Sequence, residues 1–537
     1  MALQDNGYIY KPDEQPFMAG SPASPIHTGK RQLAYVLIGL LLIFCAGLQN
    51  GLLTANMGAV RGELALDTMQ GIWVQSAYLM GNAVMGIMWL KIRQHYSLQK
   101  FVRWTLILMF VSNVLQTFGG RFELELVARF IMGVGTSGLL TLGMFYAMQT
   151  FRAGKALIPL ALSAGLMQAV SSLCYMMSPT LLADGNVTAM FVFQLAITLI
   201  CLSAVLYLPL PKGYHEPALS WRDWLSFGLF SAGVACLCAY LSLGNVVWWT
   251  TTWLGFFLAS GVLFLGLALW LEAYRDKPLI NWHWISARQI SFFLLMAMLT
   301  RLFTTEQSVG AGGVLALMGL SSEQLYGYYK LIFISSLFGL ILSIITLNPK
   351  DVRRNTMIAL LGIAVGAYLD IGVSSVTPVS HFYVSQSLIA FATFYFAGPV
   401  MLEGMVRAIA EGVEQIADFV AVYSATQVFG GLLGNAIFGA FVQIQTQAHL
   451  QNLLAQITLD DGTITTANYA QAVQMANLEA RILAYNDLFF WVWVFASLGF
   501  VVSFVFWAYR RYHQIDVLEV EMQKLQAYLA DTNRGRR

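Results

Sequence analysis

Long apolar runs recur along almost the whole chain, and each is about as long as a helix that crosses a lipid bilayer. A helix of roughly 20 apolar residues spans the hydrocarbon core, which is about 30 Å thick. Short polar breaks separate the runs. This pattern predicts an all-α polytopic membrane protein. We identify fourteen candidate spans: Leu33–Met57, Ile72–Leu90, Phe101–Phe118, Glu125–Met148, Ala156–Leu182, Val187–Leu208, Trp224–Leu243, Thr251–Leu271, Ile290–Met318, Leu325–Leu347, Thr356–Ile371, Phe382–Leu402, Phe419–Gln443 and Leu488–Ala508.

The composition supports this interpretation and excludes two other classes of protein. Of the 537 residues, 58% are hydrophobic and 11% are charged, whereas soluble domains have about 25% charged residues. So few charges cannot cover a water-facing surface of this size. The net charge of +2 argues against a nucleic-acid partner. We therefore expect a lipid bilayer around most of the chain.

The positions of Lys and Arg predict the orientation of the spans. Basic residues concentrate in cytoplasmic loops, so they should cluster in alternate loops when every span has been found. With both termini in the cytoplasm, most of the 30 Lys and Arg residues fall on the cytoplasmic side. An odd number of helices would destroy this alternation. The exceptions are Arg61, Arg121 and Arg481 on the outer side, and Arg129, Arg301 and Lys330 in or near the bilayer.

Polar breaks divide the chain into five predicted regions, two of which are tails rich in polar residues. One long outer loop contains an amphipathic stretch, Ala467 to Tyr485, that would either lie over the outer mouth or contact a partner protein. The last residues, 517–537, also have the apolar spacing of a short amphipathic helix. The regions are a disordered cytoplasmic tail (1–31), six helices (32–210), two additional helices with linkers (211–288), six more helices (289–508) with the outer loop 446–486, and a second cytoplasmic tail (509–537).

Arg129 is the clearest candidate for a functional residue. A charge in the middle of a bilayer costs about 3 kcal/mol even on the mildest scale, so it usually faces a bundle interior or a water-filled cavity. Gly133 and Gly135 follow about one turn later and allow another helix to approach closely. We expect Arg129 to hold carboxylates, water or an anionic substrate group. The alternative is an Arg that extends to the membrane interface.

Arg301 and Glu306 lie five positions apart in the ninth span, which places them on different helical faces. Each has a partner elsewhere, or the helix is broken near Gly310, Gly312 and Gly313, as transporter helices often are at substrate and ion sites. Glu306 is either a proton carrier or the counter-ion of an Arg.

Other polar residues of the spans are weaker candidates. Asp370, Lys330 and Asp418 lie nearer span ends, which favours an interfacial position. Four amides inside spans can hydrogen-bond a ligand or a neighbouring helix. They are Gln49, Asn50, Gln75 and Gln168.

The sequence lacks signatures of catalysis, metal binding or nucleotide hydrolysis. The five cysteines lie in apolar stretches, which suits small buried side chains. The seven histidines have no metal-ligand spacing to Cys or Glu. There is no phosphate-binding G-x-x-x-x-G-K-[ST] and no nucleophile elbow. We expect no enzyme activity, no metal and no cofactor, and any energy source would be an ion gradient.

Several segments together resemble the fourteen-span drug:proton antiporter branch of the major facilitator superfamily, from about Leu48 to Arg511. LVARFIMGVGTSG resembles the family's fourth-helix motif and carries its Arg at Arg129. WRDWLSFGLFSAG resembles the start of the two extra central helices. ATQVFGGLLGNAIFG, with Gly430, Gly431 and Gly434, and ILAYNDLFF resemble later motifs. The last is typical of members that work with a periplasmic adaptor and an outer-membrane channel.

The resemblance implies two six-helix bundles plus two central helices, in the bacterial inner membrane. It also implies export of amphipathic small molecules, drugs or toxic metabolites, in exchange for protons. Alternatives are uptake or uniport of a metabolite or siderophore, and a membrane scaffold without transport.

The sequence departs from the family's pattern at positions used for coupling and gating. Gln49 stands where an acidic residue is usual, so we expect proton coupling to use another carboxyl group. The fifth helix lacks the Gly-Pro run of antiporters. Gln94, Ser97 and Gln427 replace a usual Asp, Gly and Arg.

Overall fold

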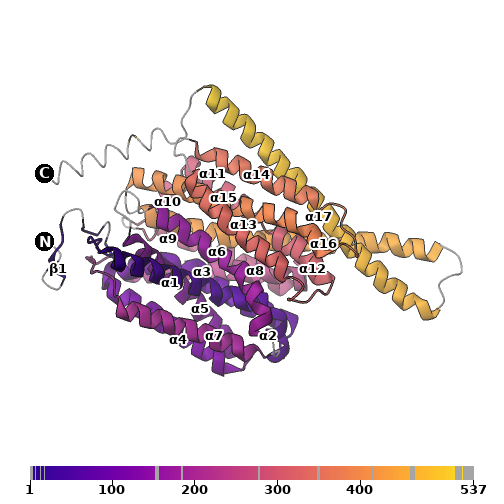
Figure 1. Cartoon of the computed structure of the whole chain (residues 1–537), viewed down its shortest axis with the longest axis horizontal. Coiled ribbons are helices and arrows are strands. Elements are labelled where there is room, and N and C mark those ends of the chain that lie inside the picture. Colours follow the sequence, from indigo (N-terminus) through magenta and orange to yellow (C-terminus); the bar gives the residue numbers. More distant parts are fainter. Residues whose placement is uncertain are drawn as a thin grey trace. The chain divides into compact units, whose positions relative to one another are not determined.

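The structure, a computed structural model, consists almost entirely of helices (Figure 1). The chain forms two compact units, each described below by itself. The first comprises Met1–Leu295, Val400–Val428 and Val517–Arg537, and the second comprises Met296–Pro399 and Phe429–Asp516. The described residues are 4–5, 8–11, 14–16, 19–150, 157–182, 186–275, 278–346, 351–412, 415–459, 466–513 and 523.

The helices of the first unit coincide with the first eight predicted spans. Two short strands near the N-terminus, β1 (Gln4–Asp5) and β2 (Tyr8–Ile9), pair antiparallel. The helices are α1 (Gly29–Ala55), α2 (Met57–Glu63), α3 (Thr68–Tyr96), α4 (Leu98–Gly119), α5 (Phe122–Met148), α6 (Leu157–Leu181), α7 (Val187–Tyr207), α8 (Trp221–Val247), α9 (Thr252–Ala273), α10 (Trp282–Ile285) and the first part of α11 (Arg288–Phe303).

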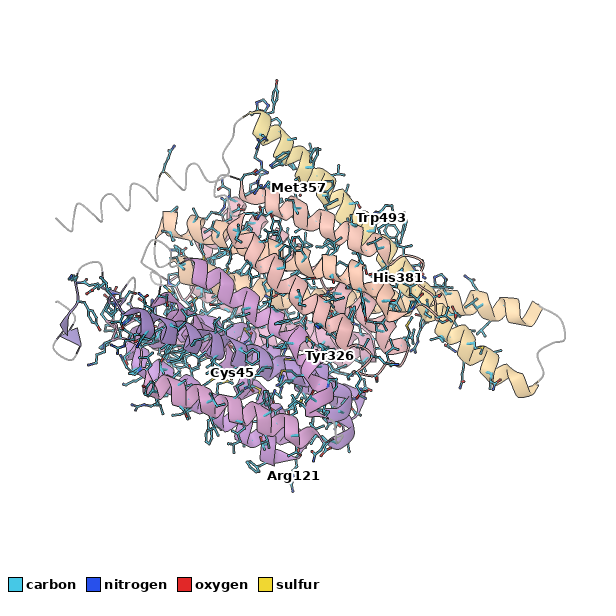
Figure 2. All side chains as sticks on the ribbon, in the orientation of Figure 1. Cys45, Arg121, Tyr326, Met357, His381 and Trp493 are labelled. Carbon is cyan, nitrogen blue, oxygen red and sulfur yellow. The ribbon has the colours of Figure 1, made fainter. Side chains whose placement is uncertain are left out.

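Helix α5 is central to the first unit, because it packs against α1, α3 and α4, while α8 packs against α3 and α9. Apolar side chains from α1, α3, α4, α5 and α7, including Leu42, Trp89, Phe101 and Tyr146, form its core. All five cysteines are free thiols. Figure 2 shows Cys45 on α1, where it is fully buried. Burial of small and large apolar groups together gives the dense packing that helix contacts in membranes require.

The second unit contains the remaining predicted spans, three of them in part. Three helices belong to both units: α11 is divided after Leu295, α15 after Pro399 and α16 after Val428. The elements are the last part of α11, the π-helical turn η2 (Gln307–Ala311), α12 (Gly312–Leu317), α13 (Tyr326–Ile345), α14 (Val352–Leu369), the 3₁₀ turn η3 (Val379–His381), α15 (Phe382–Glu411), α16 (Gln415–Leu459) and α17 (Thr466–Tyr512).

The ninth predicted span, Ile290–Met318, is a broken helix. Helix α11 ends at Phe303, and η2 and α12 continue the segment. A π-helical turn inserts one residue into the usual hydrogen-bond ladder and is frequent at functional sites. The sequence offered this break as one of two explanations for Arg301 and Glu306, and the structure contains it.

The region predicted as the outer loop, 446–486, is largely helical, and its place outside the membrane stays a prediction. Helix α16 continues to Leu459 and α17 already begins at Thr466, so most of this region is helical. Figure 1 shows these ends of α16 and α17 running out together beyond α13 and α14. His449 of α16 and Asp487 of α17 join them, with Nε2 2.7 Å from Oδ2. The amphipathic stretch Ala467 to Tyr485 is therefore part of a continuous long helix.

The structure also differs from the predicted disordered tail at residues 19–28. Gly20 donates its backbone N–H to the carbonyl of Tyr214, and Ala23 donates to that of Lys212. Gln149 at the end of α5 donates to the carbonyl of Ala23, which is fully buried. Hydrogen bonds between two polar segments leave no trace in a hydropathy profile, which explains the difference. The amphipathic helix predicted for 517–537 lies outside the described residues, apart from residue 523.

The structure confirms an all-α multi-pass membrane protein. Every predicted span is occupied by helix. Ten helices in the described part of the chain are long and apolar enough to cross a membrane by length and composition. The count of fourteen transmembrane helices stays a prediction.

Candidate transport site

Arg129 lies in the interior of the first unit, on α5. Its side chain is fully buried. Nη1 donates to the backbone carbonyl of Gln49 at 2.9 Å, and Nη2 donates to Oδ1 of Asn50 at 2.8 Å. The guanidinium carbon lies 4.8 Å from the centre of the Tyr78 ring, a cation–π contact. The side chain therefore points into the helix bundle and makes charge-assisted hydrogen bonds to α1.

A carboxyl group lies one turn before Arg129 on the same helix. Glu125 is buried, and its Oε1 accepts a hydrogen bond of 2.8 Å from Nε2 of Gln116 on α4. The carboxylate and the guanidinium attract each other, although they form no direct ion pair among the described contacts. The first unit thus holds a buried positive charge and a buried acid on one helix.

The predicted amides differ in their surroundings. Gln49 is fully buried and donates to Oγ1 of Thr198 on α7 at 3.1 Å, so its side chain joins two helices. Asn50 binds Arg129. Gln75 is half-buried, and Gln168 is exposed on α6. The structure brings Gln49, Asn50 and Arg129 together and leaves the other two amides outside this cluster.

Gly133 and Gly135 line the close contacts of α5. A side chain at Gly133 would collide with the backbone carbonyl of Tyr78 on α3. A side chain at Gly135 would lie 2.7 Å from Sδ of Met109 on α4. Hydrogen atoms in place of side chains therefore let α5 approach both neighbours.

A second buried polar cluster lies in the second unit, at Glu306. Glu306 ends the irregular turn before η2 and is fully buried. Gln386 of α15 donates from Nε2 to Oε1 of Glu306 at 3.1 Å. The same nitrogen donates to Oδ2 of Asp370 at 2.7 Å. One amide thus bridges two carboxyl groups, and no cationic side chain pairs with either acid in the described part of the chain.

Asp370 belongs to this buried cluster, although the sequence analysis favoured an interfacial position for it. It follows the last residue of α14 but is fully buried. The sequence did contain one sign of this burial, because Asp370 lies inside the predicted span Thr356–Ile371. Gln386 was not singled out at all, because an isolated amide within a span is an ordinary feature of membrane helices.

Arg301 lies apart from Glu306, and the two form no ion pair with each other in the described part of the chain. Its Nη1 donates to Oγ1 of Thr304 at 2.8 Å. A side chain at Gly430 would lie 2.7 Å from the carbonyl of Met298 and 3.0 Å from Cβ of Arg301. This glycine therefore lets α16 pack closely against α11 where Arg301 lies.

Gly431 and Gly434 lie on the same part of α16. Atoms of the Arg301 guanidinium lie 3.7 to 3.9 Å from the position of a side chain at Gly431, an ordinary contact distance. A side chain at Gly434 would collide with Oγ1 of Thr305. The predicted glycines thus surround the end of α11, where the helix breaks.

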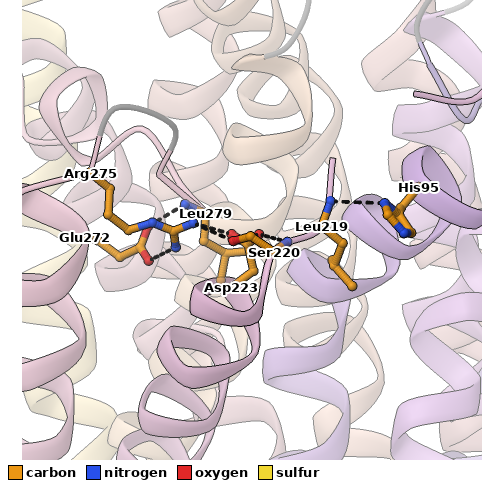
Figure 3. Close-up of polar contacts among 7 residues, drawn as sticks. All are labelled: His95, Leu219, Ser220, Asp223, Glu272, Arg275 and Leu279. Atoms are coloured by element: carbon orange, nitrogen blue, oxygen red, sulfur yellow. Dashed lines mark hydrogen bonds and ion pairs between the residues drawn. The ribbon is translucent and has the colours of Figure 1, made fainter. Parts of the chain in front are cut away.

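A third polar cluster joins the two central helices α8 and α9 (Figure 3). Arg275 donates to Oδ1 of Asp223 at 2.8 Å and to Oε1 of Glu272 at 2.7 Å. Glu272 also accepts the backbone N–H of Leu279. Burial alone would lower the pKa of Arg275, but the two carboxylates raise the pKa overall. We interpret this cluster as a clamp between helix ends rather than a transport site.

The described residues contain no group of three or more His, Cys, Asp or Glu side chains that could hold a metal ion. The polar clusters offer hydrogen bonds, fixed charge and carboxyl groups that can exchange protons. This chemistry is suited to binding and transport rather than to bond making.

Comparisons with known proteins agree with this interpretation. A model of the Major Facilitator Superfamily matches residues 39–435. The fold is similar to that of the E. coli proton:xylose symporter XylE bound to 6-bromo-6-deoxy-D-glucose, with 13% identity, a TM-score of 0.50 and coverage of 87% of this chain and 96% of that one. No curated protein matches the sequence.

Two further solved structures have a similar fold. A POT family transporter in complex with 5-aminolevulinic acid has 11% identity, a TM-score of 0.52 and coverage of 86% and 97%. The human organic anion transporter MFSD10 has 15% identity, a TM-score of 0.51 and coverage of 88% and 100%. Since the family model spans well over half of the chain, this protein belongs to the Major Facilitator Superfamily and is a secondary transporter, not an enzyme.

Proposed function

We propose that this transporter exports amphipathic small molecules, drugs or toxic metabolites, across the bacterial inner membrane in exchange for protons. It would belong to the fourteen-span drug:proton antiporter branch and work by alternating access. The observation that carries the proposal is Glu306, which is fully buried and has an amide and a second acid around it. Among the residues that the structure describes, no cation pairs with it. A buried carboxylate without a positive partner is costly, and binding a proton removes that cost.

Arg129 and Arg301 would support transport in different ways. Arg129 would supply the fixed positive charge of the first unit, since Gln49 and Asn50 hold it in one place. It would attract carboxylates, ordered water or an anionic group of the substrate. Arg301 lies where α11 breaks and α16 approaches, so it would respond to movement of the broken helix.

Proton exchange is tested with the purified full-length protein in proteoliposomes. A pH-sensitive dye in the lumen and a panel of amphipathic fluorescent dyes as substrates report both fluxes. We expect substrate movement and proton movement in opposite directions, with both lost in Glu306→Gln. Asp351→Asn is the matched control, because this acid binds Nε1 of Trp507 at 3.1 Å and is not in the Glu306 cluster. Substrate movement without any pH change would exclude proton antiport, but the protein would still be a transporter.

We also propose that a periplasmic adaptor protein, itself joined to an outer-membrane channel, binds this transporter. Support comes from the helical extensions of α16 and α17, which are much longer than a bilayer requires. Shortening both extensions by matched helical turns should abolish co-purification with the adaptor but leave transport in proteoliposomes intact. Unchanged co-purification would exclude the extensions as the binding surface.

Uptake or uniport of a metabolite or siderophore is the second candidate function. The specific observation in its favour is in helix α6, the fifth predicted span, which lacks the Gly-Pro run of antiporters. Inverted membrane vesicles distinguish the two, because an exporter accumulates the substrate inside them and an importer does not. A scaffold without transport predicts that Arg129→Ala leaves every cellular phenotype unchanged.

A further inference from the structure

Gln386 occupies a position between two acids that belong to different parts of the second unit. Its Nε2 lies 2.7 Å from Oδ2 of Asp370, and 3.1 and 3.4 Å from the two carboxylate oxygens of Glu306. All three side chains are fully buried. A carboxamide has two N–H donors, so each acid can receive one of them.

The hydrogen bonds of this cluster are incomplete. Oδ1 of Asp370 and Oε1 of Gln386 are buried, and neither has a hydrogen-bond partner among the described residues. Buried acceptors of this kind are costly, and protein structures rarely leave them unpaired. Both atoms are acceptors, so the missing component is a hydrogen atom. A proton bound to one of the acids supplies it.

The neighbours of the cluster come from η2, α15 and α17. Gly310 of η2 leaves room for Glu306. A Cβ atom at Gly310 would lie 3.3 Å from Oε1 of Glu306 and 2.8 Å from the ring of Phe489 on α17. From α15, Ser385 is buried, and its hydroxyl group donates to the backbone carbonyl of Phe382 at 3.3 Å. Tyr485 of α17 lies against Gly313, three residues after Gly310. Among the described residues, the two acids accept side-chain hydrogen bonds from the uncharged amide of Gln386, and no ion pair joins either acid to a cation.

We propose that Glu306 and Asp370 form a single proton-binding site and that Gln386 is its positioning residue. The proposal deepens the proposed proton exchange and rests on it for its role in transport. Two carboxylates this close repel each other, so the first proton converts one into a carboxylic acid and leaves one negative charge. The Gln386 amide donates to both acids in this state.

The second proton changes the role of Gln386. When both acids are protonated, each gains an O–H donor, and Oε1 of the amide can accept one of these hydrogens. A half-turn of the amide brings Oε1 to the place that Nε2 occupies now. Because Gln307 of η2 donates to the backbone carbonyl of Gln386 at 3.1 Å, this change occurs directly against the broken helix.

The proposal is tested by infrared difference spectroscopy on the full chain in lipid nanodiscs, between acidic and alkaline pH and without substrate. The wild type should show the C=O band of a buried protonated carboxyl group. Asp370→Asn, Glu306→Gln and Gln386→Met should each shift this band. The double variant Glu306→Gln with Asp370→Asn should remove the component that these two acids contribute, while a component from the buried Glu125 of the first unit remains. Asp351→Asn should leave it unchanged.

Two results would overturn the shared site. One is a wild-type band in Asp370→Asn, and the other is a wild-type band in the double variant. Asp370→Glu guards against loss of folding, because it keeps both acids and should retain a carboxyl band. The measurement needs no substrate, so a wild-type band with the expected shifts but without substrate-linked proton movement would leave this site standing and reject antiport alone.

Discussion

At the scale of single residues, Arg129 shows how a buried charge is held without an ion pair. Two oxygens of α1 and the face of Tyr78 share the guanidinium. We expect Arg129→Ala to abolish transport and to lower stability by about 1–3 kcal/mol, because Asn50 and the Gln49 carbonyl lose their donor in a buried place. Arg129→Lys keeps the charge but cannot serve both oxygens in the same planar geometry, so it should rescue little.

The measurements for Arg129 are substrate efflux in cells and thermal unfolding in detergent. Tyr78→Phe is the control, since it keeps the aromatic face and should change both values little. A fully active Arg129→Ala protein would show that the charge has only a structural role.

Sequence alone predicted some of these residues and missed others for a physical reason. Arg129 and Glu306 could be identified from the sequence, because a charge in the middle of an apolar run is costly wherever the helix lies. The burial of Asp370 depends on contact with Gln386 of another helix, and a span end gives no sign of such a partner. The roles of Gln49 and Gln386 likewise depend on tertiary contacts.

At the scale of elements, hydropathy located the helices but not their ends. The apolar parts of α16 and α17 were predicted because lipid requires them. Their polar extensions were interpreted as a loop, since a hydropathy profile cannot see the contacts that support a water-exposed helix. One such contact joins His449 to Asp487, and Asn486 of α17 accepts the backbone N–H groups of Gly372 and Val373. ILAYNDLFF thus has a structural role in this chain.

The contact between α3 and α5 gives a prediction at this scale. Gly133→Ala would place a methyl group against the Tyr78 carbonyl, which is backbone and cannot rotate away. We expect the two helices to separate and stability to fall by about 1–3 kcal/mol. Gly228→Ala on α8 is the control, because nothing lies near its added methyl group, and Ala favours helix by up to about 1 kcal/mol. Thermal unfolding of the wild type and both variants in the same detergent tests this prediction. If Gly133→Ala is as stable as the wild type, the close packing of α3 and α5 is contradicted.

At the scale of the whole molecule, the sequence correctly predicted a polytopic transporter. The predicted boundary between residues 288 and 289 follows a polar break and stays a prediction, whereas the division into compact units runs through α11, α15 and α16. A break in hydropathy marks where the chain leaves the membrane. It carries no information about which helices pack together, because packing depends on matching surfaces rather than on hydropathy.

The predicted orientation can be tested on α17 alone. This helix has 47 residues, about 70 Å of length, so its ends lie on opposite sides if it crosses a hydrocarbon core of about 30 Å. Met475 and Tyr512 are 69% and 85% exposed near those ends. A membrane-impermeant maleimide should label Met475→Cys in intact cells, and Tyr512→Cys only after permeabilisation, because the basic residues near Tyr512 favour the cytoplasm. The wild type is the control, since four of its five cysteines are buried. Labelling of both positions from one side would exclude a membrane-crossing α17, and the reverse pattern would place the C-terminus outside.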